Sequence, residues 1–321
     1  MHSSCGCDCA PEIGPNSLGG MDQLISRVAL ATAAEFPDLD EDGVVLIDAC
    51  ARNGIEAGPA VWTDETVEWS AYDMVIVRST WDYQNQHADF LEWAHRVSAG
   101  TRLANSADVL AWNTVKTYLR TLQQAGLPVV TTDWLEPGDT FVVPQGEYVV
   151  KPAVSAGSRD TNRYLAGVHD EMATAHATAL LAAGRTVMVQ PYLAGVDTEG
   201  ETALFFFGGE FSHAVRKGPL LTPAMEVVTA AYKPETIEPR EPSAAERKAA
   251  EQVLDSLARL APAPREQLVY ARVDLVPGPD GSPVLLELEL AEPSMFLVFD
   301  GTGGTASGGR FADAIRAALD G

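Results

Sequence analysis

The sequence predicts an α/β protein, with a small parallel-sheet domain at the N-terminus followed by two α+β units. In the first hundred residues, short apolar runs alternate with stretches of helical spacing, as they do in parallel sheets. Further along, strands follow one another at short intervals, and the last two are joined by a turn sequence. The chain has 321 residues, of which 46% are hydrophobic and 21% are charged, so it can bury a large core.

The N-terminal domain is expected to span residues 21–105, with its first strand beginning at Arg27. Its other elements are predicted as a helix at 40–53, strands at 57–62 and 73–78, and a helix at 84–97. The polar and aromatic run at 78–83 follows the third of these strands. Open α/β sheets bind ligands at the carboxyl ends of their strands, so this run is a candidate binding element. It can equally be the capped start of a helix.

Two further units follow, at 106–194 and 195–321. The first is predicted to contain helices at 113–124 and 170–183 and strands at 129–132, 148–152, 162–165 and 186–190. The second is predicted to contain strands at 203–207 and 211–215, a helix at 243–260, and strands at 270–276 and 284–289. The sequence Pro-Gly-Pro-Asp-Gly at 277–281 predicts a tight turn, so the last two strands should form a hairpin.

Composition excludes several classes of function. With 22 basic and 45 acidic side chains, the formal net charge is −23, which argues against nucleic acid as a partner. No apolar run approaches the ~18 residues of a membrane span. The first 20 residues carry no secretory signal, so we expect a cytoplasmic protein. This segment is expected to be a disordered tail, although Cys5, Cys7 and Cys9 could bind a soft metal there.

The predicted hairpin carries three acidic residues among apolar ones. Glu287 and Glu289 are two residues apart on one strand and therefore share a face, and the hairpin can bring Asp274 beside them. A solvated face is the plain alternative. Acidic side chains in so apolar a strand are costly without a cation, and carboxylates suit Mg²⁺ bound together with nucleotide phosphates.

Lysines are scarce, and three of them lie in patterned settings. Lys151 ends a strand and precedes a small, flexible loop that contains Ser155, Gly157 and Ser158. A lysine beside such a loop is suited to binding phosphate, although the sequence is not that of a P-loop. Lys116, which we place on the helix before Gly126, and Lys217 are further candidates; taken singly, each is as well explained as a surface charge.

The run Gln190-Pro191-Tyr192-Leu193 ends a strand and enters a turn. Such a segment can offer its backbone groups to the edge of a purine while apolar side chains clasp the ring. A simple hinge after the strand is the alternative.

The order of these motifs along the chain resembles the ATP-grasp superfamily. The resemblance extends from Arg27 to the C-terminus and implies α/β subdomains that clasp ATP, the two central ones holding the nucleotide between them. It implies that Lys116 and Lys151 contact ATP phosphates while the loop at 155–158 closes over them. It also implies that Gln190, Tyr192 and Leu193 hold adenine, and that an acidic residue, best Glu201 but otherwise Asp197, holds ribose.

By the same resemblance, Asp274, Glu287 and Glu289 would bind two Mg²⁺ ions, with Mn²⁺ as an alternative. Many members have Glu-x-Asn on this strand, whereas this chain has Glu287-Leu288-Glu289. A glutamate still supplies a metal oxygen, but its extra negative charge can change metal affinity.

The resemblance further implies an ATP-dependent carboxylate-amine ligase that forms an acyl phosphate, with Arg272 and Lys217 as catalytic residues. Arg272 could instead be a structural ion-pair partner. The runs at 78–83, 212–217 and 287–294 are similar to those of cyclo-ligases that close O-ureido-D-serine to D-cycloserine, and of glutathione-synthetase-like ligases.

In either case we expect Arg78 and Ser294 to contact the substrate, with a surface ion pair for Arg78 and a helix cap for Ser294 as alternatives. The expected partner is a small amino-acid-like molecule, for a monomer or homodimer. An intermolecular amide ligase and a non-catalytic nucleotide-binding module are the competing functions.

Overall fold

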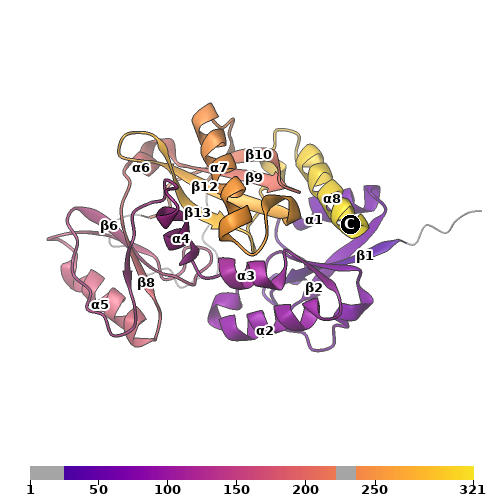
Figure 1. Ribbon diagram of the computed structural model, residues 1–321, viewed down its shortest axis with the longest axis horizontal. Helices are drawn as coiled ribbons and strands as arrows, with labels where there is room; N and C mark the ends of the chain where they lie inside the picture. Colours follow the sequence, from indigo (N-terminus) through magenta and orange to yellow (C-terminus); the bar gives the residue numbers. More distant parts are fainter. Residues whose placement is uncertain (1–24, 222–235) are drawn as a thin grey trace, which may run out of the picture.

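The computed structural model describes residues 25–221 and 236–321, whose strands form three sheets (Figure 1). The expectations for the tail at 1–20, including its three cysteines, lie outside the described residues. Among the described residues, no helix is both long enough and apolar enough to cross a membrane.

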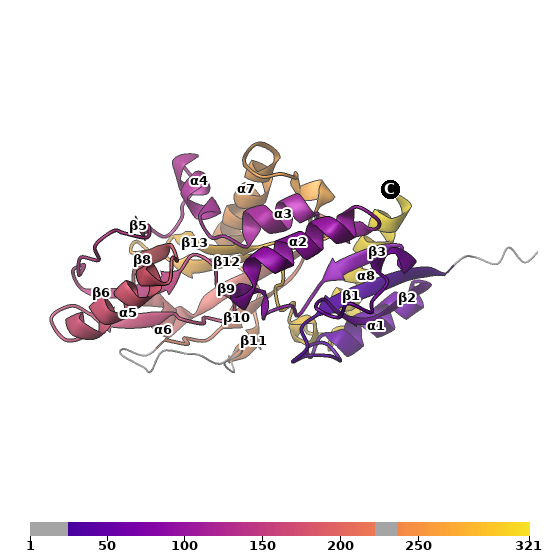
Figure 2. The same cartoon turned by 90° about the horizontal axis from the view of Figure 1, so that it is seen from below.

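The N-terminal sheet is parallel, as predicted, with the strand order β2-β1-β3-β4. Its elements are β1 (Ser26–Thr32), α1 (Gly43–Arg52), β2 (Ile55–Val61), β3 (Met74–Val77), α2 (His87–Ser98) and β4 (Arg102–Ala104). Alternate residues of β1 face opposite sides: Val28 and Leu30 pack with α1, whereas Ala29 and Ala31 pack with α2. Figure 2 shows these helices on the two faces of the sheet. The strand β4 was not predicted.

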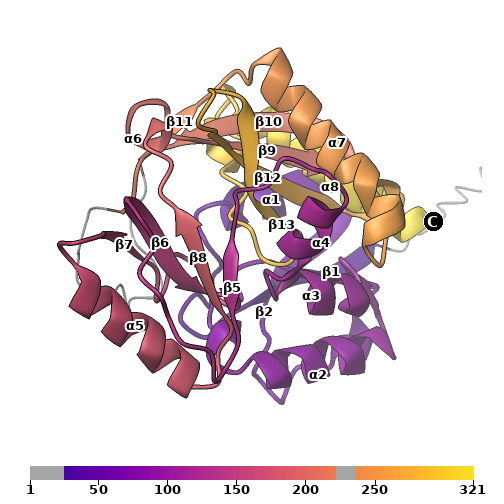
Figure 3. The same ribbon diagram turned by 60° about the vertical axis from the view of Figure 1, so that its left-hand side comes forward.

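The middle sheet has the strand order β5-β8-β6-β7 and is antiparallel. Its elements are β5 (Asp133–Leu135), β6 (Glu147–Pro152), β7 (Asn162–Leu165), α5 (Asp170–Ala182) and β8 (Val187–Pro191). The helix α5 covers one face, where Tyr148 and Val150 are buried (Figure 3). The side chains of Val149 and Lys151 therefore point to the other face, which borders a cavity.

The C-terminal sheet is also antiparallel and has the order β11-β10-β9-β12-β13. Its elements are α6 (Gly195–Glu199), β9 (Glu201–Phe207), β10 (Glu210–Lys217), β11 (Ile237–Pro239), α7 (Ala244–Leu260), β12 (Tyr270–Pro277), β13 (Pro283–Glu289) and α8 (Thr305–Asp320). Leu204 and Phe206 pack toward α7, whereas Phe205 and Phe207 pack toward α8. The predicted hairpin is confirmed as β12 and β13.

The helix α8, which was not predicted, packs on two sheets. Phe311 stacks on Phe207 of β9 with ring centroids 4.5 Å apart. The same helix shares a buried cluster with Leu46 of α1, so it joins the C-terminal sheet to the N-terminal domain. Four short 3₁₀ turns complete the described elements, at Trp69–Ala71, Tyr83–Asn85, Arg265–Gln267 and Leu297–Phe299.

Two predicted elements between the first and second sheets are different in the structure. The helix expected at 113–124 begins only at Tyr118, as α4 (Tyr118–Gln124), and it is preceded by a helix that was not predicted, α3 (Ala107–Asn113). At the end of α3, the Asn113 side chain donates to the carbonyl oxygen of Leu288 and accepts a hydrogen bond from the amide of Leu290, which ties this end of the helix to β13 and the segment after it. Lys116 lies in a loop, not on a helix. The strand expected at 129–132 makes only a single bridge, between Val129 and Leu285.

Candidate active site

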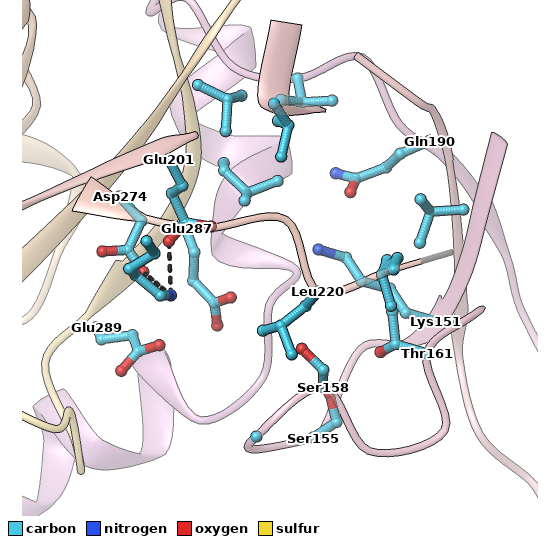
Figure 4. A pocket seen from close by; sticks show the side chains of 18 of the residues that line it. Lys151, Ser155, Ser158, Thr161, Gln190, Glu201, Leu220, Asp274, Glu287 and Glu289 are labelled. Carbon is cyan, nitrogen blue, oxygen red and sulfur yellow. Dashed lines mark hydrogen bonds and ion pairs between the residues drawn. The ribbon is translucent and has the colours of Figure 1, made fainter. Parts of the chain in front are cut away.

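A single cavity brings together nearly all of the side chains that the sequence identified (Figure 4). The middle sheet contributes Lys151 and Gln190, and the C-terminal sheet contributes Asp274, Glu287 and Glu289. The other predicted residues that line it are Lys116, Ser155, Gly157, Ser158, Tyr192, Leu193, Glu201, Lys217, Arg272 and Ser294. Arg78 and Asp197 do not line it. The functional roles assigned to the lining residues remain predictions.

The acidic wall of the cavity is built by the register of β12 and β13. Asp274 lies opposite Glu287, and Arg272 lies opposite Glu289. The Arg272 guanidinium donates through Nε to Oδ1 of Asp274 and through Nη2 to Oδ2, both at 2.8 Å, and it also pairs with Glu289. Arg272 thus joins two of the three carboxylates.

The surroundings of Asp274 and Glu289 shift the pKa values of these two carboxyl groups in opposite directions. Burial raises the pKa of Asp274, but Arg272 and Lys217 outweigh this effect, so that pKa lies below its usual value. Burial also raises the pKa of Glu289, and the neighbouring Glu287 and Asp274 add to this against the opposing charge of Arg272, so it reaches about 8. At neutral pH Glu289 is therefore largely protonated, and added positive charge at this wall would favour its ionised form.

Two buried lysines face this wall. The Nζ of Lys116 lies 2.8 Å from Oε1 of Glu287 and donates to the carbonyl oxygen of Ser155 at 2.6 Å. Burial lowers the pKa of Lys151 despite the opposing influence of Glu287. The two ammonium groups come from different elements yet border one cavity, as phosphate-binding groups would.

Lys217 and Glu201 form a further ion pair across β9 and β10. Their Nζ and Oε1 atoms are 2.6 Å apart, and Lys217 also lies 3.7 Å from Asp274. Gly200 permits this approach, because its φ of +77° is left-handed and a Cβ would lie 2.6 Å from the carbonyl oxygen of Lys217.

At the other end of the cavity, Gln190 is fixed by its Nε2, which donates to Oγ1 of Thr132 at 2.8 Å. Tyr192 and Leu193 follow it along the wall. The alternative ribose residue, Asp197, accepts hydrogen bonds from the Tyr192 hydroxyl at 2.6 Å and from Arg163 at 3.3 Å, outside the cavity lining. Of the two acidic residues predicted for ribose, Glu201 lines the cavity and Asp197 does not.

The position of Arg78 does not support its predicted contact with substrate. Its side chain is 2% exposed, and it donates to the carbonyl oxygen of Pro293 at 3.0 Å and to Asp40 at 3.3 Å. Burial and the nearby Asp40, opposed by Arg78, raise the pKa of Asp42 to about 6. Arg78 is thus a buried ion-pair residue that supports the chain next to the cavity.

Sequence reasoning missed several residues that line the cavity, among them Trp81 and Glu292. Trp81 lies in the run at 78–83, where Arg78 was selected instead. Glu292 lies three positions after Glu289, the last residue of β13, and is acidic as Glu289 is. Both residues lie in runs that the sequence analysis identified, but the local sequence does not show which side chain of each run faces the cavity.

The donor set suits a hard cation. Carboxylate oxygens of Asp274, Glu287 and Glu289 border the same cavity as the two lysines, and a cation bound among them would favour the ionised form of Glu289. Among the described residues, however, no three His, Cys, Asp or Glu side chains converge into a complete metal site. Mg²⁺ commonly binds proteins through one or two carboxylates and completes its coordination with phosphates and water.

The fold is that of the ATP-grasp ligases. The chain superimposes on the D-alanine–D-alanine ligase from Bacillus anthracis complexed with ATP with a TM-score of 0.60 at 16% identity, covering 92% of this chain and 97% of the other. For the ATP-grasp ligase PsnB complexed with minimal precursor, Mg and ADP, the TM-score is 0.56 at 20% identity, with 92% and 97% coverage. These likenesses show the fold.

Closer relatives identify the family. Residues 28–105 match the family model for the N-terminal domain of D-cycloserine synthetase DcsG. The chain is 38% identical over 305 residues to the cycloserine biosynthesis protein DcsG of Streptomyces lavendulae, covering 91% of this chain and 98% of that protein. The crystal structure of D-cycloserine synthetase DcsG gives a TM-score of 0.81 at 38% identity, with 92% and 100% coverage. The chain belongs to the D-cycloserine synthetase family and is an ATP-dependent ligase that forms C–N bonds.

Proposed function

We propose that this ligase activates the carboxylate of an amino-acid substrate as an acyl phosphate and closes O-ureido-D-serine to D-cycloserine, an antibiotic. The observation that carries the proposal is the arrangement of Lys116 against Glu287, 2.8 Å apart, with Lys151 lining the same cavity. Cations on one side and carboxylates on the other can hold a nucleotide phosphate and its metal between them.

In this proposal the substrate carboxylate takes the γ-phosphoryl group of ATP, which leaves ADP. The ureido nitrogen that is bonded to oxygen then attacks the acyl carbon, and inorganic phosphate departs. Water must also cleave the carbamoyl group from this nitrogen, which releases carbon dioxide and ammonia and leaves D-cycloserine. Lys116 and Lys151 hold phosphate oxygens and neutralise their charge. Arg272 stabilises the oxyanion that forms at the acyl carbon, and Lys217 supports it through Asp274, from which its Nζ is 3.7 Å away.

Asp274, Glu287 and Glu289 would hold two Mg²⁺ ions, or Mn²⁺ in their place, with ATP phosphates completing the coordination. Bound metal would supply positive charge to the transferring phosphoryl group. The loop with Ser155, Gly157 and Ser158 lines the cavity and would exclude water from the acyl phosphate.

ADP release by the purified chain with Mg²⁺-ATP tests the proposal, against a panel of O-ureido-D-serine, D-amino acids, dipeptides and amines, with products identified by mass. Turnover with O-ureido-D-serine alone supports cyclisation. A requirement for two substrates would replace cyclisation with an intermolecular ligase. Glu287→Gln should abolish ADP release, whereas Glu210→Gln, an exposed residue of β10, should not.

A further inference from the structure

The segment that follows β13 forms one end of the cavity. Glu292, Ser294 and Phe296 line it, whereas the residues between them, Pro293 and Met295, are buried on the opposite side. This alternation is that of an extended chain and aims the Glu292 side chain at the cavity. Figure 4 shows Glu289, three positions before Glu292, across the cavity from Gln190 of the predicted adenine segment.

The backbone of this segment is held by side chains from three parts of the molecule. Trp81 Nε1 donates to the carbonyl oxygen of Glu292 at 2.9 Å, and Arg272 Nη1 donates to that of Ser294 at 3.1 Å. The amide of Met295 donates to Asp42 at 2.9 Å. The Tyr270 hydroxyl donates to the carbonyl oxygen of Ala291 at 2.7 Å, so the backbone is fixed on both sides of Glu292 and its carboxyl has a defined place in the wall.

Glu292 differs from the other carboxylates of the wall in having no cation of its own. Asp274 and Glu289 pair with Arg272, and Glu287 pairs with Lys116. Within residues 25–221 and 236–321, no lysine, arginine or histidine lies within the 4.0 Å of an ion pair with Glu292. Burial raises the pKa of Glu292 to about 7, against the opposing hydrogen bond from Tyr83 and the charge of Lys116.

The surroundings of Glu292 suit an organic cation better than a metal. Trp81 and Phe296 line the same part of the wall, and aromatic rings attract ammonium groups. Tyr83 also occupies one side of the carboxyl as a hydrogen-bond partner, which leaves fewer oxygen sites for a metal.

We propose that Glu292 binds the ammonium group of the amino-acid substrate and so places its carboxylate toward the lysines and the phosphate. This inference rests on the proposed function for the class of substrate. Glu292 thereby selects substrates with a free amino group. Arg78 and Trp81 are positioning residues that hold Glu292 in place.

The test is calorimetric binding to the full chain loaded with Mg²⁺ and the non-hydrolysable analogue AMPPNP. The probes are O-ureido-D-serine, D-serine, and D-glycerate, which has a hydroxyl in place of the ammonium group of D-serine. We expect the wild-type chain to bind D-serine at least tenfold more tightly than D-glycerate. Glu292→Gln should weaken binding of O-ureido-D-serine and D-serine at least tenfold and leave that of D-glycerate within twofold.

Three controls accompany this measurement. Glu292→Asp keeps the charge and should recover part of the affinity, Glu210→Gln should bind as wild type, and thermal unfolding should show that each variant is folded. AMPPNP affinity and the Mg²⁺ concentration for half-maximal binding should stay within twofold in Glu292→Gln.

Two results with the wild-type chain would overturn the inference: no binding of any probe, or equal binding of D-serine and D-glycerate. Two results with Glu292→Gln would also overturn it: binding of the amino acids as in wild type, or a loss of Mg²⁺ affinity in place of a loss of amino-acid affinity. ADP release is measured separately. If the chain binds D-serine more tightly than D-glycerate but releases no ADP from ATP in the presence of O-ureido-D-serine, the proposed function is refuted and the role of Glu292 stands.

Discussion

The backbone amide of Ala156 donates a hydrogen bond to Oε1 of Gln84 at 3.0 Å, which joins the loop at 155–158 to the N-terminal domain. Gln84 in turn donates to the carbonyl oxygen of Trp81 at 3.2 Å. Val154 and Ala156 also pack on the apolar core of that domain. The loop proposed to cover the phosphates and the wall proposed to bind the substrate are therefore linked through one side chain.

Replacing Gln84 with alanine should loosen this loop without unfolding the protein. The lost hydrogen bond is worth about 0.5–1.5 kcal/mol, so we expect kcat/KM for ATP to fall about 2- to 13-fold. Steady-state ADP release measures this fall, with Gln123→Ala on the exposed face of α4 as the matched control. Equal kinetics in both variants would show that the contact does not order the loop.

Replacing Lys151 with methionine should remove a phosphate contact while filling the same space. A hydrogen bond to a charged group is worth about 1.5–3 kcal/mol, so kcat/KM for ATP should fall about 10- to 150-fold. Lys248→Met, at an exposed position of α7, provides the control for loss of a lysine. An unchanged ATP dependence in Lys151→Met would remove this residue from the proposed phosphate site.

Those parts of the site that depend on local spacing could be predicted from the sequence. Glu287 and Glu289 share a face because they are two apart on one strand, and the turn at 277–281 sets Asp274 opposite Glu287. The partner of Arg78 could not be predicted in this way, because Pro293 lies 215 positions away and meets it only through the packing of the N-terminal domain on the C-terminal segment.

The helix α8 escaped prediction for a related reason. Its first turns include Ser307, Gly308 and Gly309, which are weak helix formers. The helix gains its stability from burial of one face, where Gly308 allows a close approach to Val45 of α1: a Cβ at this glycine would lie 3.0 Å from Cγ1 of that valine. Local helix propensity does not include such tertiary stabilisation, so it could not predict this helix.

Replacing Phe311 with alanine tests how far α8 supports the fold. The side chain is fully buried and stacks on Phe207, so the substitution should lower the free energy of unfolding by about 3–5 kcal/mol. Urea unfolding followed by circular dichroism measures this loss. Ala317→Gly, which tests only local helix propensity on the same helix, should cost about 1 kcal/mol. A similar small loss for Phe311→Ala would mean that α8 contributes little to the core.

His213 lies within the run at 212–217 and supports the end of the cavity from outside. Its Nε2 lies 2.9 Å from the carbonyl oxygen of Met295, so this nitrogen carries the proton, and its Nδ1 lies 2.9 Å from the Ser212 hydroxyl. Arg310 donates to the same hydroxyl at 3.0 Å, which leaves the hydroxyl proton for Nδ1. The neutral imidazole thus satisfies its neighbours, and a second proton on the ring has no acceptor prepared for it.

This arrangement predicts that the protein loses stability as the pH falls. Burial lowers the pKa of His213 from 6.5 to about 4, despite its bond to Met295. Between these values the unfolded chain binds a proton that the folded chain does not, so the stabilisation is complete above pH 6.5 and about 3 kcal/mol of it is lost by pH 4. Urea unfolding from pH 7 to pH 4 should show that His213→Gln, which can still donate to Met295, loses about 3 kcal/mol less than wild type over this range. The exposed His95→Gln should follow wild type, and parallel pH profiles for all three proteins would show that His213 is not the group responsible.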